Sequence, residues 1–186
     1  MALKVTFDLE EKDLKYFRAQ MKAAQETAKR ASEDEVIAKA ESMINEVSAA
    51  EIPSFVRQRI ERLRALIDMV RDEEWNLAAA ERKNVLSALA YFADPEDMIP
   101  DSIPVLGYID DAIMIELVVT ELKHEIDAFQ DFCAFRTSEA ALSRNSNVTR
   151  AQYLDAKRRD LHSRMRRRRT ARAGSGGATR TRLRLF

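Results

Sequence analysis

Apolar residues recur at three- and four-residue steps along most of the chain, which is the period of a helix buried on one face. Between residues 8 and 28 this stripe consists of Leu14, Phe17, Met21, Ala24 and Ala28. A second stripe runs between residues 32 and 48, and neither segment contains glycine or proline. The pattern therefore predicts two amphipathic helices, either antiparallel or continuous through a kink.

Short polar signals indicate where the first three helices begin. Asp8 with Glu11, and Ser32 with Glu35, have the spacing of a capping box, in which two side chains satisfy the free backbone N–H groups of a helix start. Pro53 suits the first turn of a third helix, because the N–H that proline lacks would have no partner there. We therefore expect helices to start close to residues 8, 32 and 53.

The third and fourth helices are each predicted from one apolar face. The third has its apolar residues between Phe55 and Val70, and the fourth extends from about Ala79 to Phe92. Trp75 lies in the short connection between them and is predicted to fill a gap between helices. A solvent-facing side is predicted for the arginines of the third helix, which are Arg57, Arg59, Arg62 and Arg64.

A long central helix is predicted from Ala112 to about Leu142. Its first half is apolar nearly all round, which is typical of a helix covered on most sides, and only one stripe continues beyond Lys123. Asp110 or Asp111 is expected to cap it. This helix is therefore predicted to start in the core and to leave it as it proceeds.

The polar run 143–147 is interpreted as a boundary, after which Thr149 can cap a last helix to about Arg169. From Thr170 the glycine-, serine- and threonine-rich composition predicts no regular structure.

The fold class predicted from these patterns is all-α. We expect a helical bundle of about five helices with a proline-rich helix-turn-helix hairpin and a basic C-terminal arm. Residues 1–80 would supply the N-terminal amphipathic helices, and residues 81–143 the hairpin and the central helix of the same fold. Residues 150–186 would form the basic helix and flexible tail.

The hairpin is predicted from the composition of residues 93–115. A proline excludes helix for the residue before it, and glycine allows a positive φ where a chain turns back. This segment contains three of the four prolines and the first glycine of the chain: Pro95, Pro100, Pro104 and Gly107. A tight, rigid reversal between two helices is therefore expected here.

The same segment carries a long motif. It reads Asp94-Pro95-x-Asp97-x-Ile99-Pro100-Asp101-x-Ile103-Pro104-x-x-Gly107-x-x-Asp110-Asp111 and follows Tyr91-Phe92-Ala93. With this motif, the region from Arg82 to about Glu121 resembles the YkvA-like bacterial domain of unknown function. The resemblance implies an all-helical domain, membrane association for some members, and no established reaction.

Two interpretations of the acidic residues in this motif are open. Carboxylate oxygens suit Mg²⁺ or Ca²⁺, and Asp97, Asp101, Asp110 and Asp111 would converge if the hairpin closes, with Glu116 as a fifth ligand or as a group of raised pKa. In the structural alternative, Asp94, Asp110 and Asp111 cap helices, Asp97 and Asp101 bond turn amides, and Glu116 pairs with an arginine. The structural alternative is preferred because no His/Cys spacing supports a metal, and no cofactor is predicted.

Residues suited to nucleophilic catalysis are scarce. No serine or cysteine lies in an elbow motif, and no glycine-rich phosphate loop is present. Cys133 beside Phe132 is interpreted as an inert core thiol, His124 as half exposed, and His162 as part of the basic arm. The protein is therefore not expected to be an enzyme. A single cysteine, no apolar leader in the first ten residues and no long apolar run predict a cytoplasmic protein. A location peripheral to the inner membrane is what the YkvA-like resemblance implies.

Charge is distributed unevenly although the formal net charge is zero. Residues 150–186 contain 13 Lys and Arg against two acids, which leaves 18 basic and 29 acidic residues in the rest of the chain. Such a basic segment attracts nucleic acid or anionic lipid. The candidate polyanion-binding residues are Arg164, Arg166, Arg167, Arg168, Arg169 and Arg172.

The function predicted from the sequence is that of a non-enzymatic interaction protein, whose body docks a protein partner or membrane and whose arm binds a polyanion. Six or more phosphate contacts would weaken binding by on the order of 10³-fold between 50 and 200 mM salt. The alternatives are a peripheral or integral membrane-associated protein and a divalent-metal-dependent enzyme using the aspartates. The charge division also allows the basic arm to fold back onto the acidic body.

Overall fold

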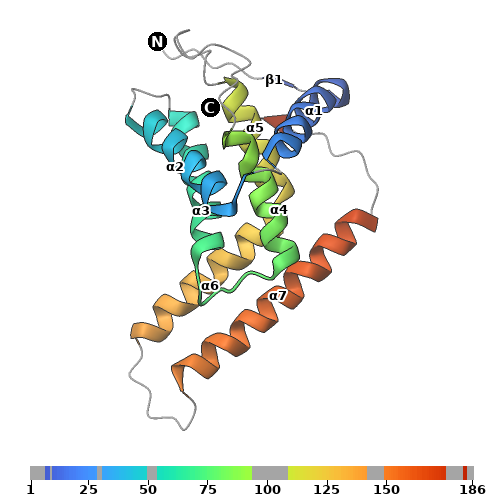
Figure 1. Ribbon diagram of the computed structural model, residues 1–186. Helices are drawn as coiled ribbons and strands as arrows, with labels where there is room; N and C mark the ends of the chain where they lie inside the picture. The colour runs from blue at the N-terminus through green and yellow to red at the C-terminus, as the bar shows by residue number, and fades with distance from the viewer. Residues whose placement is uncertain are drawn as a thin grey trace, which may run out of the picture.

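The computed structural model describes residues 7–8, 10–28, 31–49, 54–93, 109–141, 149–174 and 182–183. These residues form an all-α fold, as predicted, with one 3-10 turn and one pair of two-residue strands (Figure 1). The helices are α1 (Glu11–Ala28), α2 (Glu33–Ala49), α3 (Ser54–Arg71), α4 (Ala79–Leu89), α5 (Ile109–Glu121), α6 (Lys123–Ala141) and α7 (Arg150–Gly174), and the 3-10 turn is η1 (Ala90–Ala93).

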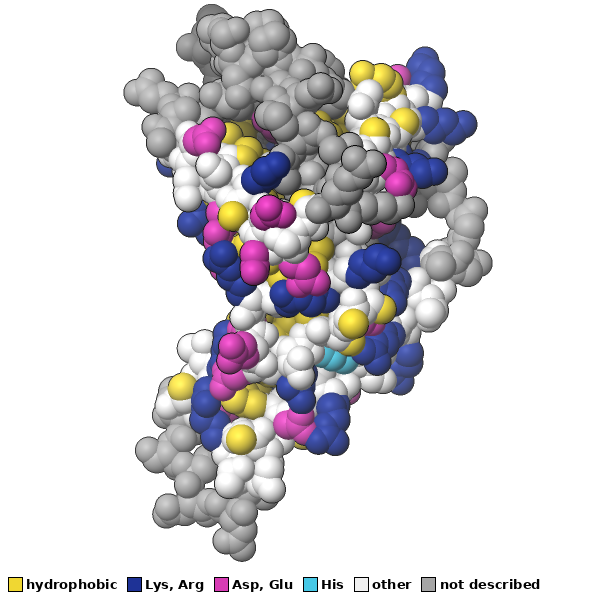
Figure 2. All heavy atoms as spheres, viewed as in Figure 1, with side chains coloured by type: hydrophobic (Ala, Val, Ile, Leu, Met, Phe, Trp, Pro, Cys, Tyr) yellow, Lys and Arg dark blue, Asp and Glu magenta, His cyan; other side chains and the backbone are white. Residues whose placement is uncertain are grey.

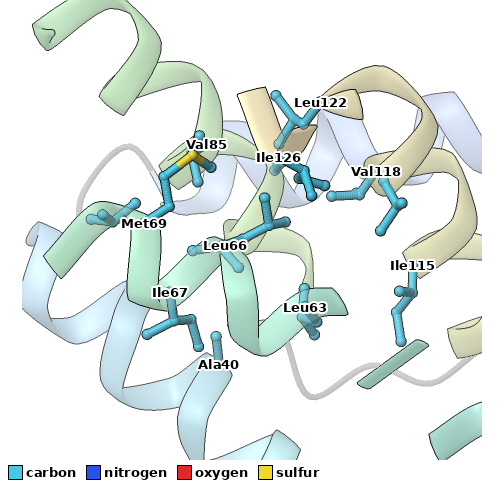
Figure 3. Close-up of a cluster of buried hydrophobic side chains, with 14 of the residues drawn as sticks. Ala40, Leu63, Leu66, Ile67, Met69, Val85, Ile115, Val118, Leu122 and Ile126 are labelled. Atoms are coloured by element: carbon cyan, nitrogen blue, oxygen red, sulfur yellow. The ribbon is translucent and has the colours of Figure 1, made fainter. Parts of the chain in front are cut away.

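The core is formed where the apolar faces of α1 to α7 meet. Leu63, Leu66 and Met69 are fully buried side chains of α3. Figure 3 shows them beside Val85 from α4 and Ile115 from α5. Because burial of apolar surface contributes about 25 cal/mol per Å², these stripes and not local propensity hold the helices in place. The stripes of the sequence therefore identified the core.

The predicted long helix is divided at Leu122. α5 ends at Glu121 and α6 begins at Lys123. Backbone bonding nevertheless continues, since Leu122 N donates to Val118 O at 2.9 Å and Ile126 N donates to Leu122 O at 3.0 Å. The division falls where the apolar pattern narrows from most of the circumference to one stripe. Counted over the described residues, it contributes to the seven helices found where about five were expected.

Two of the predicted helix caps are present. Ser32 N donates to Glu35 Oε2 at 2.7 Å and Glu35 N donates to Ser32 Oγ at 3.2 Å, which is the reciprocal bonding of a capping box. The bonds that Ser32 N and Ser32 Oγ donate to Glu35 Oε2 lower the pKa of the Glu35 carboxyl. Thr149 N likewise donates to Gln152 Oε1 at 2.9 Å, and Gln152 N donates to Thr149 Oγ1 at 3.4 Å.

The start of α1 differs from the prediction. Asp8 lies in the strand β1 (Phe7–Asp8), and Glu10 is the residue that precedes α1. Glu10 N instead donates to Asp13 Oδ2 at 2.9 Å. The prediction failed because Asp13 also stands three residues after a possible cap, and the pairing of Asp8 in a strand removes it from the helix.

The C-terminal segment is more ordered than its composition predicts. α7 continues through Thr170 to Gly174, and β2 (Arg182–Leu183) pairs antiparallel with β1. α6 and α7 lie side by side as a long antiparallel pair beneath the other helices (Figure 1). The prediction of an unstructured chain from Thr170 was therefore wrong for these residues, because it considered composition without a docking surface.

No helix among the described residues is both long and apolar enough to cross a bilayer.

Candidate functional site

Most of the acidic motif lies outside the described residues. This applies to Asp94, Asp97 and Asp101 and to the turn residues Pro95, Pro100, Pro104 and Gly107. Asp110 and Asp111 are in the first turn of α5, inside the helix and not before it as predicted. The described part of the chain contains no group of three or more His, Cys, Asp or Glu residues arranged to hold a metal. Metal binding by the whole motif stays a prediction.

Glu116, the last candidate of the motif, pairs with arginines of α3. Its Oε2 lies 3.4 Å from Nε of Arg59 and 3.8 Å from Nη1 of Arg62. The Arg59 side chain is only 8% exposed, so its prediction as a solvated residue was wrong. Burial lowers the pKa of Arg59, and Glu116 opposes that effect. A buried guanidinium needs a nearby carboxylate, and Glu116 supplies it.

The basic helix α7 docks through three buried apolar residues on one face, Leu154, Leu161 and Met165. It meets the aromatic residue of the α3–α4 connection, Trp75, which is fully buried as predicted. The centroid of the Trp75 ring lies 5.2 Å from that of Phe132 in α6. Trp75 thus joins this connection to the α6–α7 pair.

Two arginines of α7 bind buried acids of the body. Nε of Arg166 donates to Oε1 of Glu81 at 2.9 Å, and Nη1 of Arg169 donates to Oε1 of Glu125 at 3.2 Å. The Glu81 and Glu125 side chains are 4% and 1% exposed. Burial acts to raise the pKa of Glu81, but the bond from Arg166 and the charges of Arg166 and Arg169 outweigh it and lower the pKa. These pairs anchor the C-terminal half of α7.

A second ionic contact holds the N-terminal half of α7. Nη1 of Arg150 lies 3.4 Å from Oε1 of Glu74 in the α3–α4 connection, and Nη1 of Arg158 donates to the Glu74 carbonyl at 3.4 Å. Arg136 of α6 also bonds Glu74, at 3.0 Å, and lies 2.7 Å from Oδ2 of Asp72. The basic helix is therefore folded back onto acidic residues of the body, one of the arrangements that the charge division allowed.

Four arginines of α7 bind no carboxylate of the body within the described residues. Arg167 and Arg168 are exposed, and neither has a carboxylate partner within the described ranges. Arg164 pairs only with Asp160 of the same helix, at 2.6 Å, and Arg172 donates to the Thr120 carbonyl at 2.7 Å. Figure 2 shows dark blue side chains gathered along the flank that α7 forms in Figure 1. We name Arg164, Arg167, Arg168 and Arg172 the outer arginine surface.

His162 is a residue whose position the sequence analysis missed. Its ring is perpendicular to that of Trp75, with 4.2 Å between centroids, and its Nε2 is buried without a hydrogen-bond partner among the described residues. The available signal was its spacing: His162 follows Leu161 and precedes Met165 on the apolar stripe of α7. The surrounding arginines hid that stripe.

The single cysteine is poorly suited to nucleophilic chemistry. Cys133 is half-buried, and burial raises the pKa of its thiol although Arg136 acts to lower it. A thiol reacts as the thiolate, so a raised pKa reduces its reactivity at neutral pH. This agrees with the interpretation of Cys133 as a core thiol.

Residues 84–117 match the family model described as "Protein of unknown function (DUF1232)". The matched segment contains most of α4, η1 and the beginning of α5, and it ends just beyond Glu116. No curated protein and no solved structure matches the chain.

Proposed function

We propose that this is a non-enzymatic interaction protein whose outer arginine surface binds a phosphate-bearing polyanion. The proposal rests on Arg167 and Arg168, which are both exposed and both without a carboxylate partner in the described part of the chain. Guanidinium groups donate paired hydrogen bonds that match phosphate oxygens. Nucleic-acid backbones and anionic lipid headgroups share this chemistry.

The fold reduces the number of arginines available for such binding. Arg166 and Arg169 are engaged with Glu81 and Glu125, so four of the six predicted residues remain on the outer surface. Neutralising Z phosphates of duplex DNA gives a salt dependence of about −0.9Z on logarithmic axes. With Z about four, affinity falls about 10²-fold between 50 and 200 mM salt, less than the 10³-fold expected from sequence.

The test compares the full chain with Arg167→Ala/Arg168→Ala. Anisotropy of labelled duplex DNA and single-stranded RNA, and flotation with phosphatidylserine vesicles, separate the two sources of phosphate. We expect the double variant to lose at least tenfold in affinity for one of these ligands and to lower the salt slope by about two. The control is Arg57→Ala/Arg64→Ala, which removes two exposed arginines of α3.

Three results would overturn the proposal. Wild-type protein that binds none of the three ligands at 50 mM salt has no polyanion function. Equal losses in the α7 and α3 variants would reflect net charge and not a surface. Unchanged affinity in the α7 variant would place binding elsewhere. The YkvA-like motif adds no residue to this proposal. Asp110 and Asp111 are its only aspartates within the described ranges.

A further inference from the structure

The contact between His162 and Trp75 is central to the docking of α7. The two rings are perpendicular, with 4.2 Å between their centroids. Trp75 has no exposed surface, and it also contacts Phe129 and Phe132 of α6. A change at His162 is therefore transmitted to the ring that joins the α3–α4 connection to the α6–α7 pair. His162 itself is partly buried, with its Nε2 fully enclosed.

Cations surround His162 on its own helix. Arg158 and Arg166 lie four residues before and after it, which places them on the same side of α7. An added positive charge on the imidazole would be repelled by both. Because α7 holds both cations, their effect persists for as long as the helix stays folded.

The acids named above on the elements packed against α7 are already bound to arginines. Glu81 of α4 bonds Arg166, and Glu125 of α6 bonds Arg169. Glu74 of the α3–α4 connection bonds Arg136 at 3.0 Å. A charged imidazole at this site would therefore share these carboxylates with arginines, although Oε2 of Glu125 is buried without a hydrogen-bond partner among the described residues.

We propose that His162 makes the docking of α7 pH-sensitive: protonation of its imidazole against Trp75 loosens α7 from the body. The proposal concerns docking alone, and it does not depend on whether α7 binds a polyanion. Loosening would also separate Arg166 and Arg169 from Glu81 and Glu125, so one proton would weaken several contacts together.

The direction of the pH dependence follows from the surroundings. Burial lowers the pKa of His162, the charges of Arg166 and Arg158 lower it further, and Glu81 acts in the opposite direction. Undocking returns the imidazole to water, so the pKa of the undocked histidine lies above the docked value and closer to the ordinary value of about 6.5. Docking is therefore strongest above that value and weakens as pH falls toward the docked pKa, since the undocked state binds the proton more tightly. Over this range Glu81 stays ionised, because its own pKa is lowered.

An indole face attracts a cation, and this attraction opposes the effects of burial and of the two arginines. The experiment must therefore measure the sign directly. His162 is one of two histidines in the chain, and Trp75 is the only tryptophan. Trp75 fluorescence consequently reports the α7 contact without a label, and His124→Gln assigns the two histidine resonances in NMR spectra.

The test follows Trp75 emission, amide exchange of α7 and the His162 resonance in the full chain from pH 8 to pH 5. We expect a red shift of the emission and faster α7 exchange below about pH 6.5, with a His162 pKa below that value. His162→Gln cannot take up the proton and should show neither change. His124→Gln should behave as wild type.

The proposal is overturned if His162→Gln retains the transition, or if the wild-type emission and exchange stay constant to pH 5. A His162 resonance that titrates above 6.5 would also overturn it, because protonation would then strengthen docking. The resonance is measured in unsubstituted His162, so this result holds even where the glutamine variant fails to fold.

Discussion

Nε of Arg166 donates a 2.9 Å hydrogen bond to Oε1 of Glu81, across 85 residues of sequence. The acid is nearly fully buried, whereas the arginine side chain is half exposed. The two partners are therefore not equivalent: a freed arginine regains water, but a freed Glu81 remains buried. This asymmetry determines how substitutions at the α7 contact should behave.

Removing the arginines should destabilise the protein more than removing the acid charge. Arg166→Ala/Arg169→Ala leaves Glu81 and Glu125 buried without their partners, and we expect a loss of about 3 kcal/mol. Glu81→Gln keeps a hydrogen-bonding oxygen and should lose only about 1 kcal/mol. Urea denaturation measures both. The control Arg164→Ala breaks an exposed pair with Asp160 and should change stability by less than about 0.5 kcal/mol.

The loss of folding stability at acidic pH should depend on Glu81. Its folded pKa is lowered, so the stability that its ionised form contributes is present above the ordinary pKa of about 4.3 and is lost as pH falls through the folded value. Glu81→Gln should therefore lose less stability than wild type between pH 5 and pH 3. Parallel acid curves for the two proteins would show that Glu81 is not a source of this dependence.

Trp75 should be the most sensitive apolar position of the α3–α4 connection. Trp75→Ala removes a fully buried ring that contacts both α6 and α7, and we expect a loss of about 3–5 kcal/mol. Tyr16→Ala is the matched control, because the Tyr16 side chain is exposed at 55%. Its expected loss is below about 1 kcal/mol, as measured by thermal or urea unfolding. A smaller loss at Trp75 than at Tyr16 would contradict the role assigned to this ring.

The Arg59–Glu116 pair should show the cost of leaving a buried cation without its acid. Glu116→Ala is expected to destabilise by about 3 kcal/mol, because Arg59 stays buried. Arg62→Ala removes the more exposed partner of Glu116 and should cost less than about 1 kcal/mol. Equal losses in the two variants would show that Glu116 does not compensate Arg59. Circular dichroism during urea unfolding provides the measurement.

Cys133 should react slowly with thiol reagents in the folded protein. Burial raises the pKa of its thiol, which lowers the thiolate fraction at pH 7.4. Labelling with dithionitrobenzoate should be at least tenfold slower than in about 6 M urea. Equal rates in the two conditions would show that neither burial nor the raised pKa protects the thiol.

Local signals in the sequence predicted structure correctly where the bonds that they describe join residues only a few positions apart. The Ser32–Glu35 box was predictable from two residue types at a fixed spacing, and the structure shows both of its bonds. Asp8 has equally suitable spacing for a helix cap, yet it pairs in a strand with Arg182, near the other end of the chain. Several neighbouring residues can bond the free N–H groups of a helix start. Here the strand pairing of Asp8, a long-range contact, left that role to Asp13.

Long-range placement explains the remaining differences. Arg59 has the same charge as Arg57 and Arg64, but it alone of the three is buried against Glu116 of α5. His162 lay unnoticed among arginines because its importance comes from Trp75, which is 87 residues earlier in the chain. Most of the acidic motif stays untested, since Asp94, Asp97 and Asp101 fall outside the described residues.

The sequence by itself determined the all-helical class, the apolar faces that form the core and the unequal division of charge. These follow from periodicity and composition, which are properties of the chain before it folds. Only the tertiary structure decided which arginines turn inward to Glu81 and Glu125 and which face solvent. Helices of the same sequence pattern can dock in several orientations, and the choice between them depends on burying carboxylates with partners, which no local pattern records.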